Sequence, residues 1–275
     1  MTRYHSHTTS YFGVSTTCAL LVILLLTLIG SPTLYARDKE GRFIVVIDAG
    51  HGGHDSGAKG KVSYEKNVVL AVSKKVGAKI NELAPQIKVY YSRPDDNFIG
   101  LQDRARFAIK KNADLFVSIH ANASNSHSPS GTETYVLGLH RTEDNLRVAM
   151  KENSAILLED NYSKKYEDFD PTSSESYIIF QFMANKHLEN SLRLAKLVQN
   201  GFKSVSRYDR GVRQAGFLVL REAAMPSVLI EIGFITNREE ERYINSQSGQ
   251  AKIANEIAKA VIEYERQIRR RSGKQ

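Results

Sequence analysis

The stretch VIDAGHGGHDSGAKG, residues 46–60, combines two histidines and two aspartates with several glycines, directly after an apolar run. Histidine and carboxylate side chains bind zinc and other transition metals. The glycines at 50, 52 and 53 let the backbone approach a metal ion or a substrate closely, because they carry no Cβ atom. This stretch is therefore a candidate catalytic or metal-binding turn, and His51 is its first candidate ligand.

Three more ionisable residues occupy comparable places in the sequence. Glu65 opens a predicted helix, His120 ends the apolar run LFVSIH, and Glu231 lies within the apolar run VLIEIGF. Ligands of an open α/β sheet collect at the carboxyl ends of its strands. If these strands are parallel neighbours, we expect His51, Glu65, His120 and Glu231 to converge on one crevice.

Such a set has a defined chemistry. Two histidines and one carboxylate form a typical catalytic zinc site, which keeps a fourth position for water. The metal lowers the pKa of that water and polarises a carbonyl group, and a separate carboxylate must take and return the proton. Glu231 suits this last task, because an ionised group inside an apolar strand is costly without a cationic partner. His51, Glu65 and His120 are the predicted metal ligands.

Each of these residues also has a purely structural explanation. A histidine at a strand end often serves only as a hydrogen-bonding group. Glu65 could be favoured by the dipole at a helix N-terminus, and Glu231 could be a buried ion-pair partner. Spacing alone leaves both explanations open. We assign less chemistry to the remaining candidates: His54 (a contact behind the ligands), Asp55 and His127 (loop groups), Arg93 and Arg104 (ion-pair or capping groups) and His187 (a helix residue).

The elements that must position these residues follow from hydrophobic periodicity. Helical and extended patterns alternate along most of the chain, which is typical of an α/β sheet covered on both faces. Asn237 is the predicted N-cap of a helix, with Glu240 as its reciprocal partner. Residues from about 141 to 190 interrupt the pattern as a helical insertion. Strands are predicted at 42–48, 87–92, 113–122, 131–139, 215–220 and 227–235, and helices at 65–83, 101–111, 142–160, about 175–203, from 238, and 250–271.

The N-terminus has the layout of a secretory signal peptide. Arg3 precedes an apolar run at 18–30, which is too short to span a bilayer comfortably, since a spanning helix needs roughly 20 residues. The segment SPTLYA follows, so residues 1–36 are the predicted signal and 37–275 the mature chain. An uncleaved membrane anchor is the alternative. The only cysteine, Cys18, leaves with the signal, which excludes a cysteine nucleophile or a zinc–thiolate site.

The amino-acid composition does not identify a binding partner. The chain has 275 residues, 41% hydrophobic and 25% charged, which suggests one domain with ample material for a core. Its net charge of +8 fits nucleic acid, a membrane surface or a cell-wall polymer, or simply a solvated basic surface. Nucleic acid conflicts with the signal peptide.

Four ordered motifs carry a family resemblance: IDAGHGGHDSGA, YEKN, SIHANA and PSVLIEIGFITNREEER. Together they resemble the zinc-dependent N-acetylmuramoyl-L-alanine amidases of the type 3 family. The similarity extends from about Phe43 to Gln267. It implies an α/β fold with a single twisted, mostly parallel sheet of about six strands, flanked by helices.

The resemblance also implies the roles of individual residues. It places Zn²⁺ on His51, Glu65 and His120 and the catalytic carboxylate on Glu231, in agreement with the residue types. The implied substrate is peptidoglycan, cut at the amide between N-acetylmuramic acid and L-alanine during cell-wall remodelling and daughter-cell separation. Glu231 would take a proton from the attacking water and return it to the departing amine.

The insertion resembles that of the cell-division members of the family. In those members a helix blocks the active site until an activator protein displaces it, so we expect autoinhibition by residues around 142–175. Glu152 and Glu159 are the candidate plugs. A flap that shapes the substrate site is the alternative, and removing the segment should raise the basal activity if it inhibits.

Two other classes of function are weighed against this one. A zinc peptidase acting on wall peptides would use a related architecture, and product analysis separates it from an amidase. A non-catalytic wall-binding protein conflicts with the complete set of His51, Glu65, His120 and Glu231. The resemblance implies a periplasmic location, with secretion or anchoring by an uncleaved signal as alternatives, and no stable membrane insertion once the signal is removed.

Overall fold

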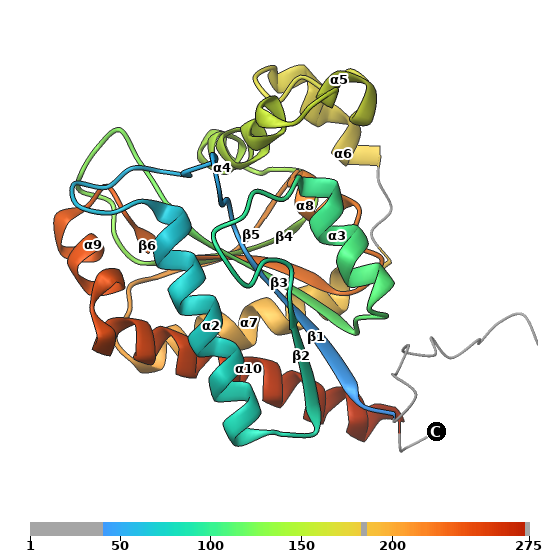
Figure 1. Cartoon of the computed structure of the whole chain (residues 1–275), viewed down its shortest axis with the longest axis vertical. Helices are drawn as coiled ribbons and strands as arrows, with labels where there is room; N and C mark the ends of the chain where they lie inside the picture. The colour runs from blue at the N-terminus through green and yellow to red at the C-terminus, as the bar shows by residue number, and fades with distance from the viewer. Residues whose placement is uncertain (1–40, 183–185, 273–275) are drawn as a thin grey trace, which may run out of the picture. The chain divides into compact units, whose positions relative to one another are not determined.

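The computed structural model describes residues 41–182 and 186–272. The predicted signal segment lies outside these residues. Six strands form one sheet in the order β2-β1-β3-β6-β4-β5 (Figure 1). Its strands are β1 (Phe43–Ala49), β2 (Ile87–Tyr91), β3 (Leu115–Asn122), β4 (Thr132–Leu137), β5 (Asp209–Ala215) and β6 (Ser227–Phe234).

The sheet is mostly parallel, as predicted. Only the pairing of β4 with β6 is antiparallel, while β4 and β5 are parallel to each other. The parallel pairs β1–β3 and β3–β6 place the carboxyl ends of three neighbouring strands at one edge. The central strands β1, β3 and β6 are buried along their whole length, as expected for strands covered on both faces.

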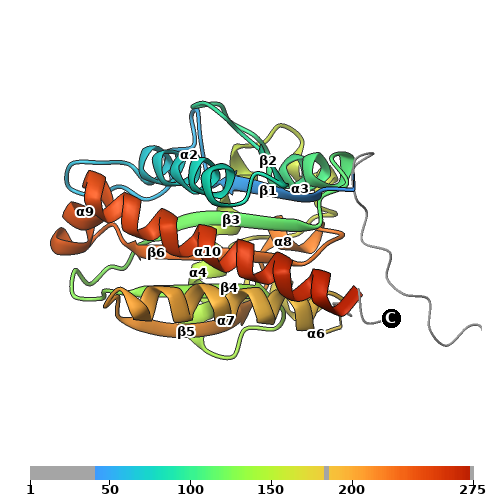
Figure 2. The same ribbon diagram turned by 90° about the horizontal axis from the view of Figure 1, so that it is seen from below.

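Helices cover both faces of this sheet. One face carries α2 (Glu65–Leu83), α7 (Leu188–Ser204) and α10 (Gln247–Ser272), which lie in front of the strands in Figure 2. The other face carries α3 (Leu101–Lys110), α8 (Leu218–Arg221) and α4 (Glu143–Asn153). The predicted apolar stripe of α2 is buried from Val69 to Ile80, but Leu83, which we assigned to the same stripe, is half exposed at the helix end.

Helix α9 (Arg238–Asn245) leads from β6 towards α10 and begins at the predicted cap. The side chain of Asn237 accepts hydrogen bonds from the backbone N–H groups of Glu239 and Glu240. The reciprocal half of the predicted box is wrong. The Glu240 carboxylate instead lies 2.7 Å from Nη2 of Arg207 and accepts a hydrogen bond from the Gly131 N–H.

Two predicted elements are wrong. The apolar run at 215–220 is not a strand: it forms the buried turn of α8, and the strand is the preceding polar segment β5. A short apolar run does not distinguish a buried strand from a buried helical turn. Because β5 is an edge strand, most of its side chains are only partly buried, which gives it a polar sequence.

The predicted long helix from about 175 to 203 is also interrupted. A 3₁₀ turn η2 (Ser174–Ile178), a short helix α6 (Ile179–Phe182) and α7 occupy this range. Tyr177 and Phe180 belong to a hydrophobic cluster with Phe217 on one sheet face, whereas α7 packs against α10 on the other. One straight helix cannot pack against both faces of the sheet, so the chain must break between these segments.

The insertion consists of α4, a 3₁₀ turn η1 (Ser154–Leu158), α5 (Tyr162–Lys165), η2 and α6, grouped beside α3 and α8 in Figure 1. It is packed rather than detached. Its buried apolar side chains join one cluster with Leu101, Phe217 and Leu218 of the sheet domain: Leu146, Ala149, Ile156, Tyr166, Phe169, Tyr177 and Phe180.

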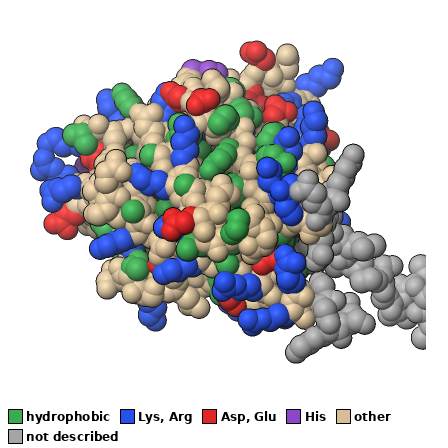
Figure 3. Space-filling model, turned by 60° about the horizontal axis from the view of Figure 1, so that its bottom comes forward, with side chains coloured by type: hydrophobic (Ala, Val, Ile, Leu, Met, Phe, Trp, Pro, Cys, Tyr) green, Lys and Arg blue, Asp and Glu red, His purple; other side chains and the backbone are tan. Residues whose placement is uncertain are grey.

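Surface features are consistent with the composition. Lysine and arginine side chains are spread over the face shown in Figure 3, with fewer acidic side chains among them, and they do not gather in one patch. Within residues 41–182 and 186–272, no helix has the length and apolar character that crossing a bilayer requires.

Candidate metal centre and active site

The sheet brings the four predicted site residues together. His51 lies two residues after the end of β1, Glu65 is the first residue of α2, and His120 lies near the carboxyl end of β3. Glu231 is the register partner of His120 on the neighbouring strand β6. All four are buried. The expected convergence at the carboxyl edge of the sheet therefore exists.

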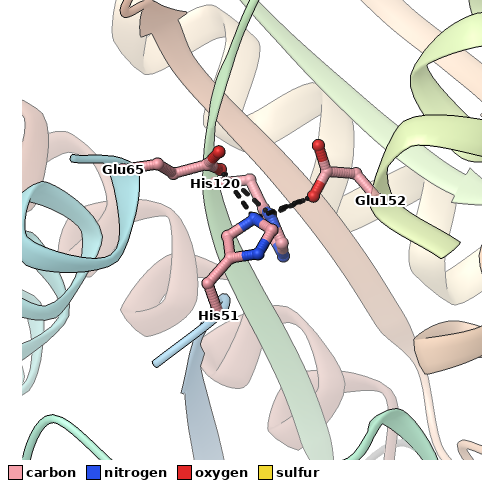
Figure 4. A group of neighbouring side chains, drawn as sticks. All are labelled: His51, Glu65, His120 and Glu152. Carbon is pink, nitrogen blue, oxygen red and sulfur yellow. Dashed lines mark hydrogen bonds and ion pairs between the residues drawn. The ribbon is translucent and has the colours of Figure 1, made fainter. Parts of the chain in front are cut away.

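A fifth residue completes the cluster from the insertion. Glu152 of α4 points at the histidines from the side opposite Glu65 (Figure 4). Its Oε2 lies 3.0 Å from Nε2 of His51 and 2.8 Å from Nδ1 of His120. Oε1 of Glu65 lies 3.2 Å from both of those nitrogens. The four candidate donor atoms, from His51, Glu65, His120 and Glu152, lie within 4.8 Å of one another.

This donor set fits a transition metal. Nε2 of His51 and Oε2 of Glu152 are buried and make no hydrogen bond within the described part of the chain, although they lie 3.0 Å apart. Buried polar atoms normally find such a partner. Donor atoms that face each other without hydrogen-bond geometry can share a cation between them. Two imidazole nitrogens and carboxylate oxygens are the donors that zinc prefers when thiolates are absent.

His51 owes its orientation to the tight turn around it. Its backbone has a φ of 59°, which is uncommon for a residue with a side chain. A Cβ atom at Gly57 would lie 2.6 Å from the ring of His51, and one at Gly50 would lie 2.3 Å from the ring of His120. Nδ1 of His51 lies 2.8 Å from Oδ2 of Asp55, which leaves Nε2 for the cluster.

Two buried arginines hold the backbone of this turn. Arg104 pairs with Asp48 at 2.9 Å and donates to the carbonyl groups of Ala49 and His51. Arg93 donates to the carbonyl groups of Ala49 and Gly50. Burial disfavours the charged form of Asp48, but Arg104 and two serine hydroxyls outweigh burial and lower its pKa. The arginines thus act as structural ion-pair and hydrogen-bonding groups, as predicted.

Glu231 differs from the other carboxylates. Both of its carboxylate oxygens are buried and lack a hydrogen-bond partner among the described residues. Burial raises the pKa of Glu231 well above its usual range, and the nearby Glu152 carboxylate raises it further. A desolvated carboxyl group with a raised pKa, beside a cluster that could hold a metal ion, is suited to proton transfer.

Lys151, the residue before Glu152, also reaches the site, and it was not predicted from the sequence. Its Nζ lies 2.7 Å from Oε1 of Glu152 and 3.5 Å from Oε2 of Glu65. Burial opposes the charge of Glu152, but Lys151 and His120 favour it more, so the pKa of Glu152 lies well below its usual range. Glu152 is therefore ionised where it meets the histidines.

Among the weaker candidate residues, Asp55 contacts the ring of a predicted metal ligand. His54 stacks on Phe98 with the ring centroids 4.1 Å apart, so the partner behind His51 is Asp55 and not His54. A carboxylate four residues after a candidate ligand histidine was the available signal, because such pairs commonly orient metal ligands. His127 is exposed and contacts the carbonyl of Thr236, and His187 precedes α7.

Glu159, the second candidate plug, does not reach the histidines. Its Oε1 accepts hydrogen bonds from the backbone N–H of Leu101, at 2.9 Å, and from the hydroxyl of Tyr166, at 2.7 Å. Leu101 is the first residue of α3. Glu159 therefore caps a helix of the sheet domain, and Glu152 alone of the two meets the cluster.

Comparison with known proteins identifies the family. The family model described as N-acetylmuramoyl-L-alanine amidase, of type 3, matches residues 45–263. The chain belongs to this family. The amidase AmiA of Escherichia coli is 36% identical over 245 residues, which cover 88% of this chain and 82% of AmiA. The chain is thus an N-acetylmuramoyl-L-alanine amidase, a hydrolase of peptidoglycan.

Solved amidase structures share the fold. The N-acetylmuramoyl-L-alanine amidase of Clostridium difficile 630 has a TM-score of 0.60 and 32% identity, covering 81% of this chain and 96% of that one. The amidase AmiC2 of Nostoc punctiforme has a TM-score of 0.60 and 30% identity, covering 82% of this chain and 98% of that one. The predicted family and fold are confirmed.

Proposed function

We propose that this amidase hydrolyses the bond between N-acetylmuramic acid and L-alanine with a zinc ion held by His51, Glu65 and His120. The convergence of these three side chains beside Glu231, at the carboxyl edge of the sheet, carries the proposal. The position of Nε2 of His51 supports it, because this buried nitrogen makes no hydrogen bond within the described residues while it faces the carboxylates of Glu65 and Glu152.

The residues divide the chemistry between them. A bound zinc ion would polarise the scissile carbonyl and lower the pKa of the attacking water. Glu231 accepts the proton of that water and delivers it to the departing alanine amine. Its burial suits both steps, because a pKa raised well above the usual carboxyl range strengthens Glu231 as the group that takes up this proton and passes it on. Asp55 fixes the ring of His51 so that Nε2 faces the site.

Mass spectrometry of digested peptidoglycan tests this proposal. We expect release of stem peptides that begin with a free L-alanine amine, and loss of that release when a chelator removes the metal. Glu231→Gln should bind zinc with unchanged affinity but hydrolyse about 100- to 10,000-fold more slowly, the usual contribution of a general acid–base group. Near-normal turnover by this variant would refute the role of Glu231, and products cut elsewhere in the peptide would indicate a zinc peptidase.

We further propose that Glu152 inhibits the enzyme by occupying the zinc site. Its carboxylate is ionised, buried and within 3.0 Å of both histidines' ring nitrogens. Glu152→Ala should raise basal hydrolysis at least about tenfold, since it removes a charge-assisted contact of about 1.5–3 kcal/mol. Glu143→Ala, which removes an exposed glutamate from the same helix, is the matched control. Equal rates for both variants would refute inhibition by Glu152.

An activator protein that displaces α4 completes this proposal. Exposed apolar side chains on the insertion, Leu157, Leu158, Ile178 and Ile179, support a protein contact there. In the source cells, the double variant Leu157→Ser, Leu158→Ser should remain inactive, because the activator can no longer bind. The Glu152→Ala variant should be active without the activator. Full activity of the leucine variant would exclude this contact.

We also propose export to the periplasm for wall remodelling and separation of daughter cells. The apolar segment at 18–30 and the absence of further cysteines support export. Fractionation of cells that produce the full chain, with N-terminal sequencing of the product, tests it. A cytoplasmic chain that retains Met1 would contradict export.

A further inference from the structure

A pocket of about 630 Å³ adjoins the metal-binding cluster, between α4 and the strands β4 and β5. Lys151 lines it and also contacts Glu152 of the cluster. Glu133, another lining residue, is the register partner of Glu231 on β4. The pocket thus begins beside the proposed proton-transfer group and extends away from it.

This pocket is cationic. It is lined by Arg147, Lys151, Arg210 and Arg213, with Glu133 and Asp144 as its acidic groups. Asp144 is paired with Arg147 on the surface of α4. Lys151 is paired with Glu152, so the positive charge that remains faces the pocket from the two arginines of β5, which share the one carboxylate of Glu133.

Glu133 fixes the two arginines of β5 in place. Its Oε2 lies 2.9 Å from Nε of Arg213 and 3.2 Å from Nε of Arg210, and its Oε1 accepts a hydrogen bond of 2.6 Å from Asn122. Glu133 is buried. Because it binds both guanidinium groups through Nε, their terminal nitrogens stay available for another acceptor.

One of those terminal nitrogens is already used by the insertion. Nη1 of Arg213 donates to the side-chain oxygen of Asn145 on α4 at 2.9 Å. The guanidinium of Arg210 lies 4.9 Å from the ring centroid of Phe234, and its terminal nitrogens make no hydrogen bond within the described residues. The pocket therefore offers a preorganised pair of cations, one of them covered by an oxygen of α4.

We propose that Arg210 and Arg213 bind a carboxylate of the stem peptide, and that Asn145 occupies part of this subsite while α4 is in place. The inference rests on the proposed function. On the glycan side of the scissile bond, the lactyl carboxyl group is consumed in the amide and leaves no charge. The stem peptide carries free carboxylates along its length and at its end. A fixed guanidinium pair is suited to a carboxylate, so the pocket receives the peptide side.

Soluble muropeptides with selectively amidated carboxylates test this subsite. The substrates are the free form, a form amidated at the carboxylate nearest L-alanine, and a form amidated only at the terminal carboxylate. Each is digested by the full chain carrying Glu152→Ala, alone or with Arg210→Gln, Arg213→Gln or Arg213→Lys. Arg106→Gln removes an exposed arginine of α3, away from the pocket, and is the matched control.

Amidation of the recognised carboxylate should lower kcat/KM of the parent about 10- to 100-fold. Arg210→Gln and Arg213→Gln should lose a similar factor on the free substrate and lose nothing more on the amidated one. Arg213→Lys should keep part of the activity, and Arg106→Gln should match the parent. The amidated form that reproduces the loss identifies which carboxylate is bound.

Two outcomes overturn the inference, and they differ from failure of the proposed function. Equal rates on all three substrates, or the same amidation effect in the arginine variants as in the parent, exclude the subsite. Should Arg213→Gln unfold because Glu133 loses its partner, Arg210→Gln and Arg213→Lys decide alone. Absence of chelator-sensitive cleavage of every substrate by every variant would refute the proposed function itself.

Discussion

At the scale of single residues, the donor atom Nε2 of His51 depends on neighbouring groups that orient its ring. Asp55 holds Nδ1 of His51, and Gly57 admits the ring. We predict that Asp55→Asn weakens zinc affinity about 10- to 100-fold, the usual effect of losing such a partner. Competition with a chromophoric chelator measures this affinity. Asp103→Asn, an exposed aspartate of α3, should leave it unchanged, and unchanged affinity in Asp55→Asn would contradict the role of Asp55.

The four candidate site residues could be identified from the sequence, but not all of the contacts that they make could be. His51, Glu65, His120 and Glu231 were predictable because strand and helix ends mark the carboxyl edge of an α/β sheet. The choice between Glu152 and Glu159 was not. Both lie in the insertion with equivalent chemistry, and only tertiary packing sends one to the histidines and the other to the start of α3.

At the scale of elements, the buried pair of Asp48 on β1 and Arg104 on α3 ties the sheet to the helix that faces it. We predict that Asp48→Asn destabilises the fold by about 3–5 kcal/mol at pH 7, because the buried guanidinium loses its anion. Urea unfolding measures this. The exposed Asp95→Asn should cost little, and a neutral Asp48→Asn would show that the pair does not hold these elements together.

The same pair predicts a pH dependence. The pKa of Asp48 in the folded chain is below its ordinary value of 3.8. Its contribution is therefore complete above that ordinary value and is lost as the pH falls through the lower folded-state pKa. The stability difference between the parent chain and Asp48→Asn should shrink below about pH 4. A difference that stays constant down to pH 3 would contradict this assignment.

Element boundaries were predictable where one periodicity ran without interruption, as in α2 and β6. They were not where the chain changes environment. The run at 215–220 is apolar because the turn of α8 is buried under the insertion, and β5 is polar because it forms a sheet edge. The hydrophobic pattern of a segment reflects how deeply the segment is buried. For residues 215–220, burial depends on the insertion, which is distant in the sequence.

For the whole molecule, the insertion both inhibits, in our proposal, and completes the core. Buried side chains of residues 142–175, among them Ile156, Tyr166 and Phe169, pack against the sheet domain. Each contributes about 1.5–3 kcal/mol, so their sum approaches the total stability of an ordinary domain, about 5–15 kcal/mol. The segment is therefore an integral part of the fold.

Removing residues 142–175 should accordingly unfold or aggregate the enzyme instead of activating it. Glu152→Ala removes the contact to the histidines and leaves the aromatic packing of the insertion in place, so it should keep the cooperative unfolding of the parent. Thermal unfolding followed by circular dichroism compares the two. A deletion chain that unfolds cooperatively with a Tm near that of the parent would show that the sheet domain has a sufficient core of its own. The inhibitory segment would then be one that can be removed without destabilising the rest of the enzyme.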